Sequence, residues 1–288
     1  MMPNQQATSS RRYEVGKVKA SSDLRGSIRA AVNAIGGFES YIKAGDAITL
    51  KPNLNTADPF PASSDPAFIK ALAEEMLSVG VAKIRIVESS MVSLQTRKAA
   101  EQNGLSRVAD ELGIEMVFLD EGAWAPVQIE RGVYLKKISI GAAATEAQKL
   151  VLVPCLKTHA FARFTATMKL FVGWTKPTDR LKMHARHLEE KVVDLASHFR
   201  PSLIVMDARK VFVSGGPAHG QVEEPGFILA GDNMLAVDIE GLKILKEYVA
   251  PNKLESDIWD IPQVRHAVRI GIGPATQDDI AVVESDKT

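Results

Sequence analysis

Apolar residues follow two kinds of spacing along this chain. Short, nearly continuous apolar runs such as residues 202–208 are typical of buried strands, whereas Phe68, Leu72 and Met76 recur at the spacing of one helix face. Strands are predicted at residues 13–20, 46–53, 81–90, 114–120, 151–155, 202–208, 227–232 and 280–284, and helices at residues 24–37, 66–80, 95–112, 182–198 and 234–249. The repeated order of strand, helix and strand predicts the α/β class, with a mainly parallel sheet and helices on both faces.

The same pattern predicts a short leader followed by a single domain. Residues 1–12 are polar and are expected to form a disordered leader, whereas residues 13–288 have the length of a single α/β domain. Within that domain, residues 125–141 alternate around a turn at Gly132, which is typical of a hairpin. A small lobe is therefore expected over residues 121–148.

Composition and charge narrow the classes of partner and location. Lys plus Arg and Asp plus Glu both number 35, so the net charge is zero and we expect no nucleic-acid partner. No apolar run reaches the roughly 20 residues of a membrane span, which predicts a cytoplasmic protein with no membrane partner. The single cysteine, Cys155, cannot hold an iron–sulfur cluster, which needs about four thiolates. The sequence leaves open whether the chain forms a homo-oligomer.

Cationic and imidazole side chains gather after the predicted strand 151–155. Lys157 and His159 stand two positions apart, so they face the same way if the chain stays extended. Lys169 follows in a short helical segment, and all six histidines lie at or beyond position 159. Fixed positive charge beside a group that titrates near neutral pH predicts a site for a small anion.

Polar side chains also follow other predicted strands. Because the carboxyl ends of parallel strands meet at one edge of a sheet, we expect these side chains to form a ligand cleft. The candidate substrate-binding residues are Lys51, Asn53, Glu88, Ser89, Lys157, Thr158, Arg163, Gly215 and Gly216. Asp207 is a candidate for orienting an imidazole or binding a cation. These patterns also have a purely structural explanation. Charged residues are common at strand ends, because the chain leaves the core there, and Gly-Gly-Pro at 215–217 is first of all a turn signal.

Several short motifs occur together in one order along the chain. They are Lys51-Pro52-Asn53, Lys157-Thr158-His159, Thr165, Lys169, His184, Asp207, Gly215-Gly216-Pro217 and Ala236-Val237-Asp238. In this combination, over about residues 45–245, the chain resembles the family known as domain of unknown function 362. Members of that family often carry a ferredoxin-like cluster domain. The resemblance therefore implies that a redox role of this chain would need a separate iron–sulfur partner.

A more distant likeness concerns the spacing of His159, Lys169 and His184, which stand ten and fifteen residues apart. This spacing is similar to that of lactate racemase-type enzymes, which use a nickel cofactor tethered to a lysine. The resemblance implies that His159 is a proton-transfer base, that Lys169 anchors a cofactor or substrate, and that His184 is a metal ligand. A divalent metal or a lysine-tethered cofactor is accordingly one expectation for a cofactor that is otherwise unknown.

These observations predict an enzyme that binds a small carboxylate- or phosphate-bearing metabolite and catalyses an isomerase- or lyase-like proton transfer. His159 is the preferred general acid or base, because an imidazole titrates near neutral pH. Lys169 and Asp207 complete the catalytic candidates. Two alternatives stay open: a non-catalytic protein that binds or delivers a small ligand or metal cofactor, and a redox accessory that needs an iron–sulfur partner.

Overall fold

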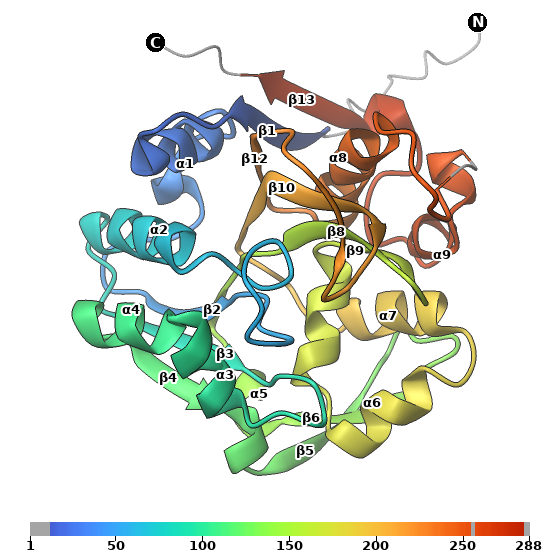
Figure 1. Ribbon diagram of the computed structural model, residues 1–288, viewed down its shortest axis with the longest axis horizontal. Helices are drawn as coiled ribbons and strands as arrows, with labels where there is room; N and C mark the ends of the chain where they lie inside the picture. The colour runs from blue at the N-terminus through green and yellow to red at the C-terminus, as the bar shows by residue number, and fades with distance from the viewer. Residues whose placement is uncertain (1–11, 255–256, 285–288) are drawn as a thin grey trace, which may run out of the picture.

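A computed structural model of the protein describes residues 12–254 and 257–284 (Figure 1). The predicted leader, residues 1–12, lies outside the described residues except for its last position. In the described part, eleven strands form one sheet whose main path is β13-β1-β12-β10-β7-β2-β3-β4. These strands are β1 (Tyr13–Lys19), β2 (Ala47–Lys51), β3 (Lys83–Glu88), β4 (Glu115–Phe118), β7 (Lys149–Leu152), β8 (Cys155–His159), β9 (Arg163–Thr165), β10 (Leu203–Gly215), β11 (Gly220–Glu223), β12 (Phe227–Gly231) and β13 (Ile280–Glu284).

The sheet is mixed and mostly parallel, which confirms the predicted class. β2 runs parallel to β3 and β7, β3 to β4, and β10 to both β7 and β8. β12 is antiparallel to its neighbours β1 and β10, and the hairpin pairs β8–β9 and β10–β11 are also antiparallel. The parallel strands therefore carry residues 51, 88 and 157 to neighbouring parts of the molecule.

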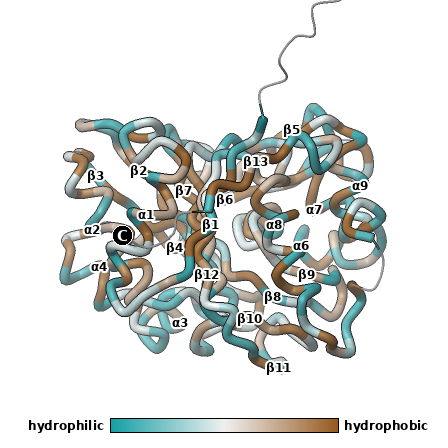
Figure 2. The backbone as a smooth tube through the Cα atoms, turned by 90° about the horizontal axis from the view of Figure 1, so that it is seen from above, coloured by the Kyte–Doolittle hydropathy of each residue, from teal (hydrophilic) through white to brown (hydrophobic). Residues whose placement is uncertain are grey.

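Helices cover both faces of the sheet, as predicted. On one face lie α1 (Leu24–Asn33), α2 (Pro66–Ser78), α3 (Thr96–Asn103) and α4 (Leu105–Leu112), and on the other α7 (Leu188–Ala196), α8 (Met234–Lys246) and α9 (Pro262–Arg269). Val205 of β10 packs into one core, and its neighbours Ile204 and Met206 pack into the other. β10 is thus apolar on both sides, and Figure 2 shows apolar strand segments between the two helical layers.

Side chains at the helix starts explain where several helices begin. Asp23, Asp65 and Asn233 accept hydrogen bonds from backbone N–H groups in the first turns of α1, α2 and α8, at 2.9 to 3.0 Å. The remaining short elements are α5 (Ala142–Thr145), α6 (Pro177–Met183) and the 3₁₀ helices η1 (Phe38–Ser40), η2 (Leu119–Glu121), η3 (Met168–Trp174), η4 (Ile258–Asp260) and η5 (Gln277–Asp279). No helix among the described residues is long and apolar enough to cross a bilayer.

A separate two-stranded sheet forms the predicted hairpin, from β5 (Trp124–Gln128) and β6 (Lys137–Gly141). Figure 1 shows it beside α6, and Ser139 of β6 donates its backbone N–H to the Asp179 carboxylate at 3.1 Å. The hairpin turn is held by Asp194 of α7, which accepts three consecutive backbone N–H groups of residues 133–135 at 2.6 to 3.0 Å.

Three predicted elements are interrupted. The helix expected over residues 95–112 breaks at Gly104, where φ is 97°, and the one over residues 182–198 breaks at His187, where φ is 54°. The strand expected at residues 151–155 ends at Leu152, because Pro154 has no N–H for the ladder. The chain then re-enters the sheet as β8, so residues 157–159 belong to a strand.

Candidate functional site

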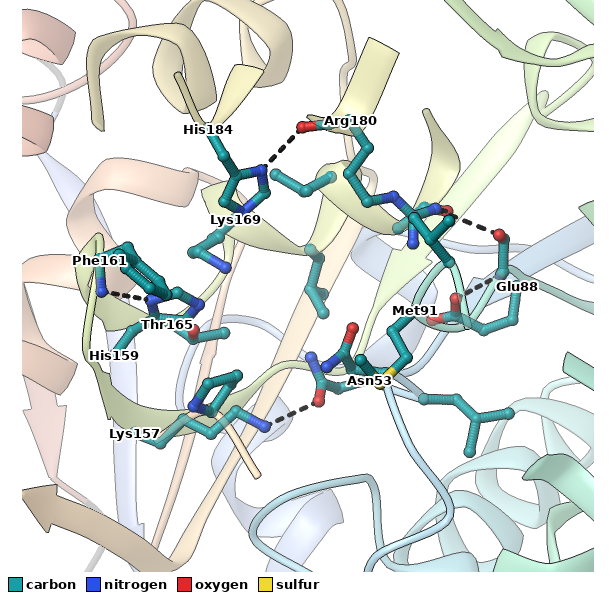
Figure 3. A pocket seen from close by; sticks show the side chains of 18 of the residues that line it. Asn53, Glu88, Met91, Lys157, His159, Phe161, Thr165, Lys169, Arg180 and His184 are labelled. Atoms are coloured by element: carbon teal, nitrogen blue, oxygen red, sulfur yellow. Dashed lines mark hydrogen bonds between the residues drawn. The ribbon is translucent and has the colours of Figure 1, made fainter. Parts of the chain in front are cut away.

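A cavity of about 410 Å³ opens where β2, β3 and β8 end, with η3 and α6 closing its far side (Figure 3). Its polar lining consists of Lys51, Asn53, Asn55, Glu88, Ser89, Ser93, Lys157, His159, Thr165, Lys169, Arg180 and His184. Its apolar lining consists of Leu54, Met91, Val92, Phe161, Leu170, Val172, Leu181 and Pro217, with Gly173 between them. Eight predicted site residues, including both histidines, therefore share one cavity.

β8 delivers two of these side chains through its alternation. Lys157 and His159 both face the cavity, whereas Thr158 between them faces away. The Thr158 carbonyl instead meets the loop after β10: a Cβ on Gly216 would lie 1.9 Å from that oxygen. Only glycine permits this approach, and it places Pro217 against the cavity.

The Lys157 ammonium is fully occupied. It donates hydrogen bonds to Asn53 Oδ1 at 3.0 Å, to the Pro61 carbonyl at 3.1 Å and to the Ala62 carbonyl. Its side chain is 1 % exposed, and burial lowers the pKa of Lys157 to about 8. Lys157 and Asn53 therefore hold the loop after β2 in place. Lys157 also contributes positive potential, but its hydrogen bonds leave it little freedom to bind a ligand directly.

Lys51 and Glu88 form a buried ion pair on neighbouring strands, with Nζ 2.6 Å from Oε1. The second Glu88 oxygen accepts the Ser89 backbone N–H at 2.7 Å, and the Lys51 ammonium also lies 5.4 Å from the Trp174 ring centre. Burial lowers the pKa of Lys51, and the Glu88 carboxylate opposes this shift. The pair is thus self-neutralising, and both members already have partners.

Lys169 differs from the other cavity lysine and arginine residues. Its ammonium makes no hydrogen bond or ion pair with any residue that the structure describes, and the side chain is half-buried at the start of η3. Burial, together with the positive charges of Lys157 and Arg180, lowers the pKa of Lys169 to about 7. A cationic group with no internal partner, facing a cavity, is available to a ligand.

The hydrogen bonds of His159 fix where its proton sits. Its Nδ1 accepts the backbone N–H groups of Phe161 and Ala162, both at 3.1 Å, so Nδ1 carries no hydrogen and Nε2 does. Burial and the nearby charges of Lys169 and His184 lower the pKa of His159 to about 2. The ring is therefore a neutral hydrogen-bond donor. This differs from its expected role as a base, because the two backbone donors occupy its lone pair.

His184 carries the opposite tautomer. Its Nδ1 lies 2.7 Å from the Arg180 carbonyl, which can only accept, so Nδ1 bears the hydrogen and Nε2 keeps a lone pair. The residue is exposed at the cavity mouth, and partial burial of its ring lowers the pKa of His184. Figure 3 draws the Lys169 amine between the two imidazoles. The cavity thus combines one imidazole donor with one imidazole acceptor.

Arg180 is a cavity residue that sequence reasoning missed. Its guanidinium donates to the carbonyls of Ser90, Gly173 and Thr175 at 2.6 to 3.1 Å and to Ser89 Oγ at 3.2 Å. Within the described part of the chain, neither its buried Nε nor the buried Thr165 hydroxyl has a hydrogen-bond partner. The signal that could have found Arg180 is its position four residues before His184, which places both on one helical face.

Five predicted residues do not line the cavity: Thr158, Arg163, Asp207, Gly215 and Gly216. The Asp207 carboxylate is taken by Arg209 at 2.7 Å, and Arg163 pairs with Glu189 at 3.0 Å. An aspartate bound in this way does not orient a cavity imidazole. Glu88 is the carboxylate that lines the cavity, but it does not orient an imidazole either, because it pairs with Lys51.

Charge balance favours an anionic ligand. The lining contains four cationic side chains, of Lys51, Lys157, Lys169 and Arg180, and one carboxylate, of Glu88. A metal held by side chains alone does not fit, because no three His, Cys, Asp or Glu residues among those described lie close enough together to hold one. His184 offers a single free imidazole nitrogen for any metal.

The chain is similar to known proteins in sequence and in structure. The Thylakoid-associated protein sll1697 of Synechocystis sp. (strain ATCC 27184 / PCC 6803 / Kazusa) is 24% identical over 277 residues, which cover 93% of this chain and 80% of that protein. The lactate racemase apoprotein from Thermoanaerobacterium thermosaccharolyticum is structurally similar with a TM-score of 0.41 and 12% identity. The match covers 83% of this chain and 58% of that structure.

The family assignment rests on a match to a family profile. The profile described as Domain of unknown function (DUF362) matches residues 48–243, which extend from the second residue of β2 into α8 and include every polar side chain that lines the cavity. This confirms the resemblance expected from the ordered motifs. The chain belongs to the DUF362 family.

Proposed function

We propose that the protein is an enzyme that binds a small carboxylate- or phosphate-bearing metabolite and transfers a proton to or from it. The observation that carries this proposal is the Lys169 ammonium, which has no partner among the described residues and which Figure 3 draws between two imidazoles of opposite tautomer. An anion beside Lys169 favours its charged form, so the lysine stays protonated when the ligand is bound.

The tautomers then divide the chemical roles. Nε2–H of His159 donates to an oxygen on which negative charge develops, as a neutral imidazole does when it polarises a carbonyl. The free Nε2 of His184 accepts the proton, and its exposure at the cavity mouth lets it return that proton to water. The unpartnered Thr165 hydroxyl and Arg180 Nε add hydrogen-bond donors for the anion. This arrangement supports isomerase- or lyase-like chemistry beside a carboxylate or phosphate.

Anion binding is tested with propanoate and inorganic phosphate by calorimetry. Lys169→Met should weaken the affinity for both at least tenfold, because it removes the one cavity ammonium that has no partner among the described residues. The matched control is Lys182→Met, whose side chain is 79% exposed on the neighbouring helix and outside the cavity lining. Equal affinities of the two variants would contradict the anion site.

Proton transfer is tested by exchange of carbon-bound hydrogen with D₂O, followed by NMR over a panel of small hydroxy- and keto-acids. His184→Gln should slow exchange by about a hundredfold to ten-thousandfold and leave anion affinity intact, because a general base is removed. A protein that binds these acids and returns every one of them unexchanged is a carrier, and the enzymatic proposal then fails.

A further inference from the structure

The mouth of the cavity is apolar although its base is cationic. Six lining residues are exposed, and four of them are apolar: Met91 at 38%, Val92 at 47%, Leu181 at 62% and Phe161 at 75% exposure. Ser93 and His184 are the other two. We call these four apolar residues the rim. Most ligand sites place polar side chains toward water, so this distribution is the reverse of the ordinary one.

The rim is assembled from three separate segments. Met91 and Val92 follow β3, Phe161 lies in the turn between β8 and β9, and Leu181 is on α6. No single hydrophobic run of the sequence accounts for them, since the fold brings them to one opening. Exposed apolar side chains gathered around a cavity mark a binding surface more often than scattered ones do.

An apolar wall continues from the rim toward the base. Leu54, Leu170 and Val172 line the cavity and are at most 7% exposed. The same cavity is lined by Lys157 and Lys169, which supply the positive potential. A ligand that enters therefore meets apolar contacts along its length and cationic groups at its inner end.

We propose that the ligand is an amphipathic anion: a carboxylate or phosphate head group at Lys169 with an unbranched apolar chain that extends along the wall to the rim. The head group rests on the function proposed above, and the chain rests on the rim. A volume of about 410 Å³ lies within the range of small-molecule sites and suits a head group with a short chain.

The experiment compares homologous straight-chain acids by calorimetry at pH 6, below their micelle concentrations. The probes are propanoate, hexanoate and decanoate, with the corresponding alkyl phosphates as a second series. Affinity should rise by up to about fourfold per methylene until the chain passes the rim, because each buried methylene removes apolar surface from water. A slope found in one series alone identifies that head group and supports the proposal.

Two variants distinguish binding of the alkyl chain at the rim from nonspecific hydrophobic adsorption to the protein surface. Phe161→Ser with Leu181→Ser should flatten the slope and leave propanoate affinity unchanged, since both side chains are exposed and their loss spares the fold. The matched control is Val249→Ser, a fully exposed apolar residue outside the cavity lining, which should change nothing.

Three results would overturn the inference. The first is propanoate binding with no slope, which leaves the proposed function standing. The second is a slope that persists in Lys169→Met, since the chain then binds without its head group. The third is an unchanged gain in affinity per methylene in the Phe161→Ser, Leu181→Ser variant. The rim would then not bind the alkyl chain, and its exposed apolar side chains would instead suit a contact with another macromolecule. Failure of every acid and phosphate to bind contradicts the proposed function itself.

Discussion

Two histidines of one cavity are given different chemistry by the backbone around them. His159 receives two backbone N–H groups at Nδ1, and His184 gives its Nδ1–H to a carbonyl. Neither bond involves another charged side chain. The direction of a main-chain dipole therefore decides which ring donates into the cavity and which accepts.

The lowered pKa of Lys169 predicts how anion binding depends on pH. Below pH 7 the ammonium is already formed and propanoate affinity should be flat. Above pH 7 the free protein must take up a proton to bind, so affinity should fall by up to tenfold per pH unit. Calorimetry at pH 8 in two buffers of different ionisation enthalpy measures this uptake, and Lys169→Met should abolish it. Affinity that rises from pH 7 to pH 8 would contradict the assignment.

Some features of the individual cavity residues could be predicted from the sequence, whereas others could not. The alternation of Lys157 and His159 follows from a strand, and it is observed. The saturation of Lys157 could not be foreseen, because the Pro61 and Ala62 carbonyls come from a loop almost a hundred residues earlier. The tautomers were equally hidden, since they depend on turn geometry after β8.

At the scale of elements, η3 owes its position to a side chain on α8. The fully buried Asp238 accepts the backbone N–H groups of Thr167 at 2.7 Å and Met168 at 3.1 Å, just before Lys169. A carboxylate at this end of a helical turn satisfies donors that have no partner within the turn. α8 thus holds in place the segment that presents the cavity lysine.

Burial raises the pKa of Asp238 to about 7, and this predicts a pH-dependent stability. Because the folded state holds the proton more tightly than the unfolded chain, stability should fall as pH rises from about 4 through 7, by at most about 1.4 kcal/mol per pH unit. Urea denaturation at pH 5, 6 and 7 measures the slope. Asp238→Asn removes the titrating group and should give a shallower one. Parallel slopes for the two proteins would contradict the prediction.

Element boundaries were predicted less well than element types. Residues 95–112 and 182–198 each have a continuous helical pattern, yet each breaks where one residue adopts a positive φ. A positive φ costs glycine little conformational energy, so Gly104 is an ordinary place for a helix to end. Histidine is not a typical helix-ending residue, so the sequence does not predict the break at His187. His187 also contacts a residue distant in sequence, Tyr134, whose ring centre lies 4.7 Å from that of His187.

At the scale of the molecule, Asp194 joins the β5–β6 hairpin to helices of the main fold. The carboxylate of this fully buried residue binds three N–H groups of the hairpin turn with one oxygen and lies 2.7 Å from Nε2 of His266 on α9 with the other. One side chain therefore links α7, α9 and the hairpin.

Loss of this carboxylate should destabilise the whole protein. Asp194→Ala leaves the hairpin N–H groups and the His266 ring without their acceptor, and we expect a loss of about 3 kcal/mol or more in the free energy of unfolding. Urea denaturation measures it. Asp278→Ala, at an exposed aspartate, serves as the control and should stay within about 0.5 kcal/mol of the native protein. Equal midpoints for both variants would show that the lobe is held by other contacts.

The α/β class, the helices on both faces and the hairpin were predictable from periodicity alone. The sheet order was not, because β1 lies between β12 and β13 rather than beside β2. Pairing between strands distant in sequence leaves no local pattern to read.

That placement has a consequence for the chain as it is being made. β1 ends at Lys19, and neither of its neighbours begins before Phe227, so about 10–40 s of synthesis separates the strand from its partners. An unpaired strand edge is prone to join other chains during such an interval. Lys17 and Lys19 put charge on alternate positions of β1, and lysines on a strand edge disfavour pairing with another chain.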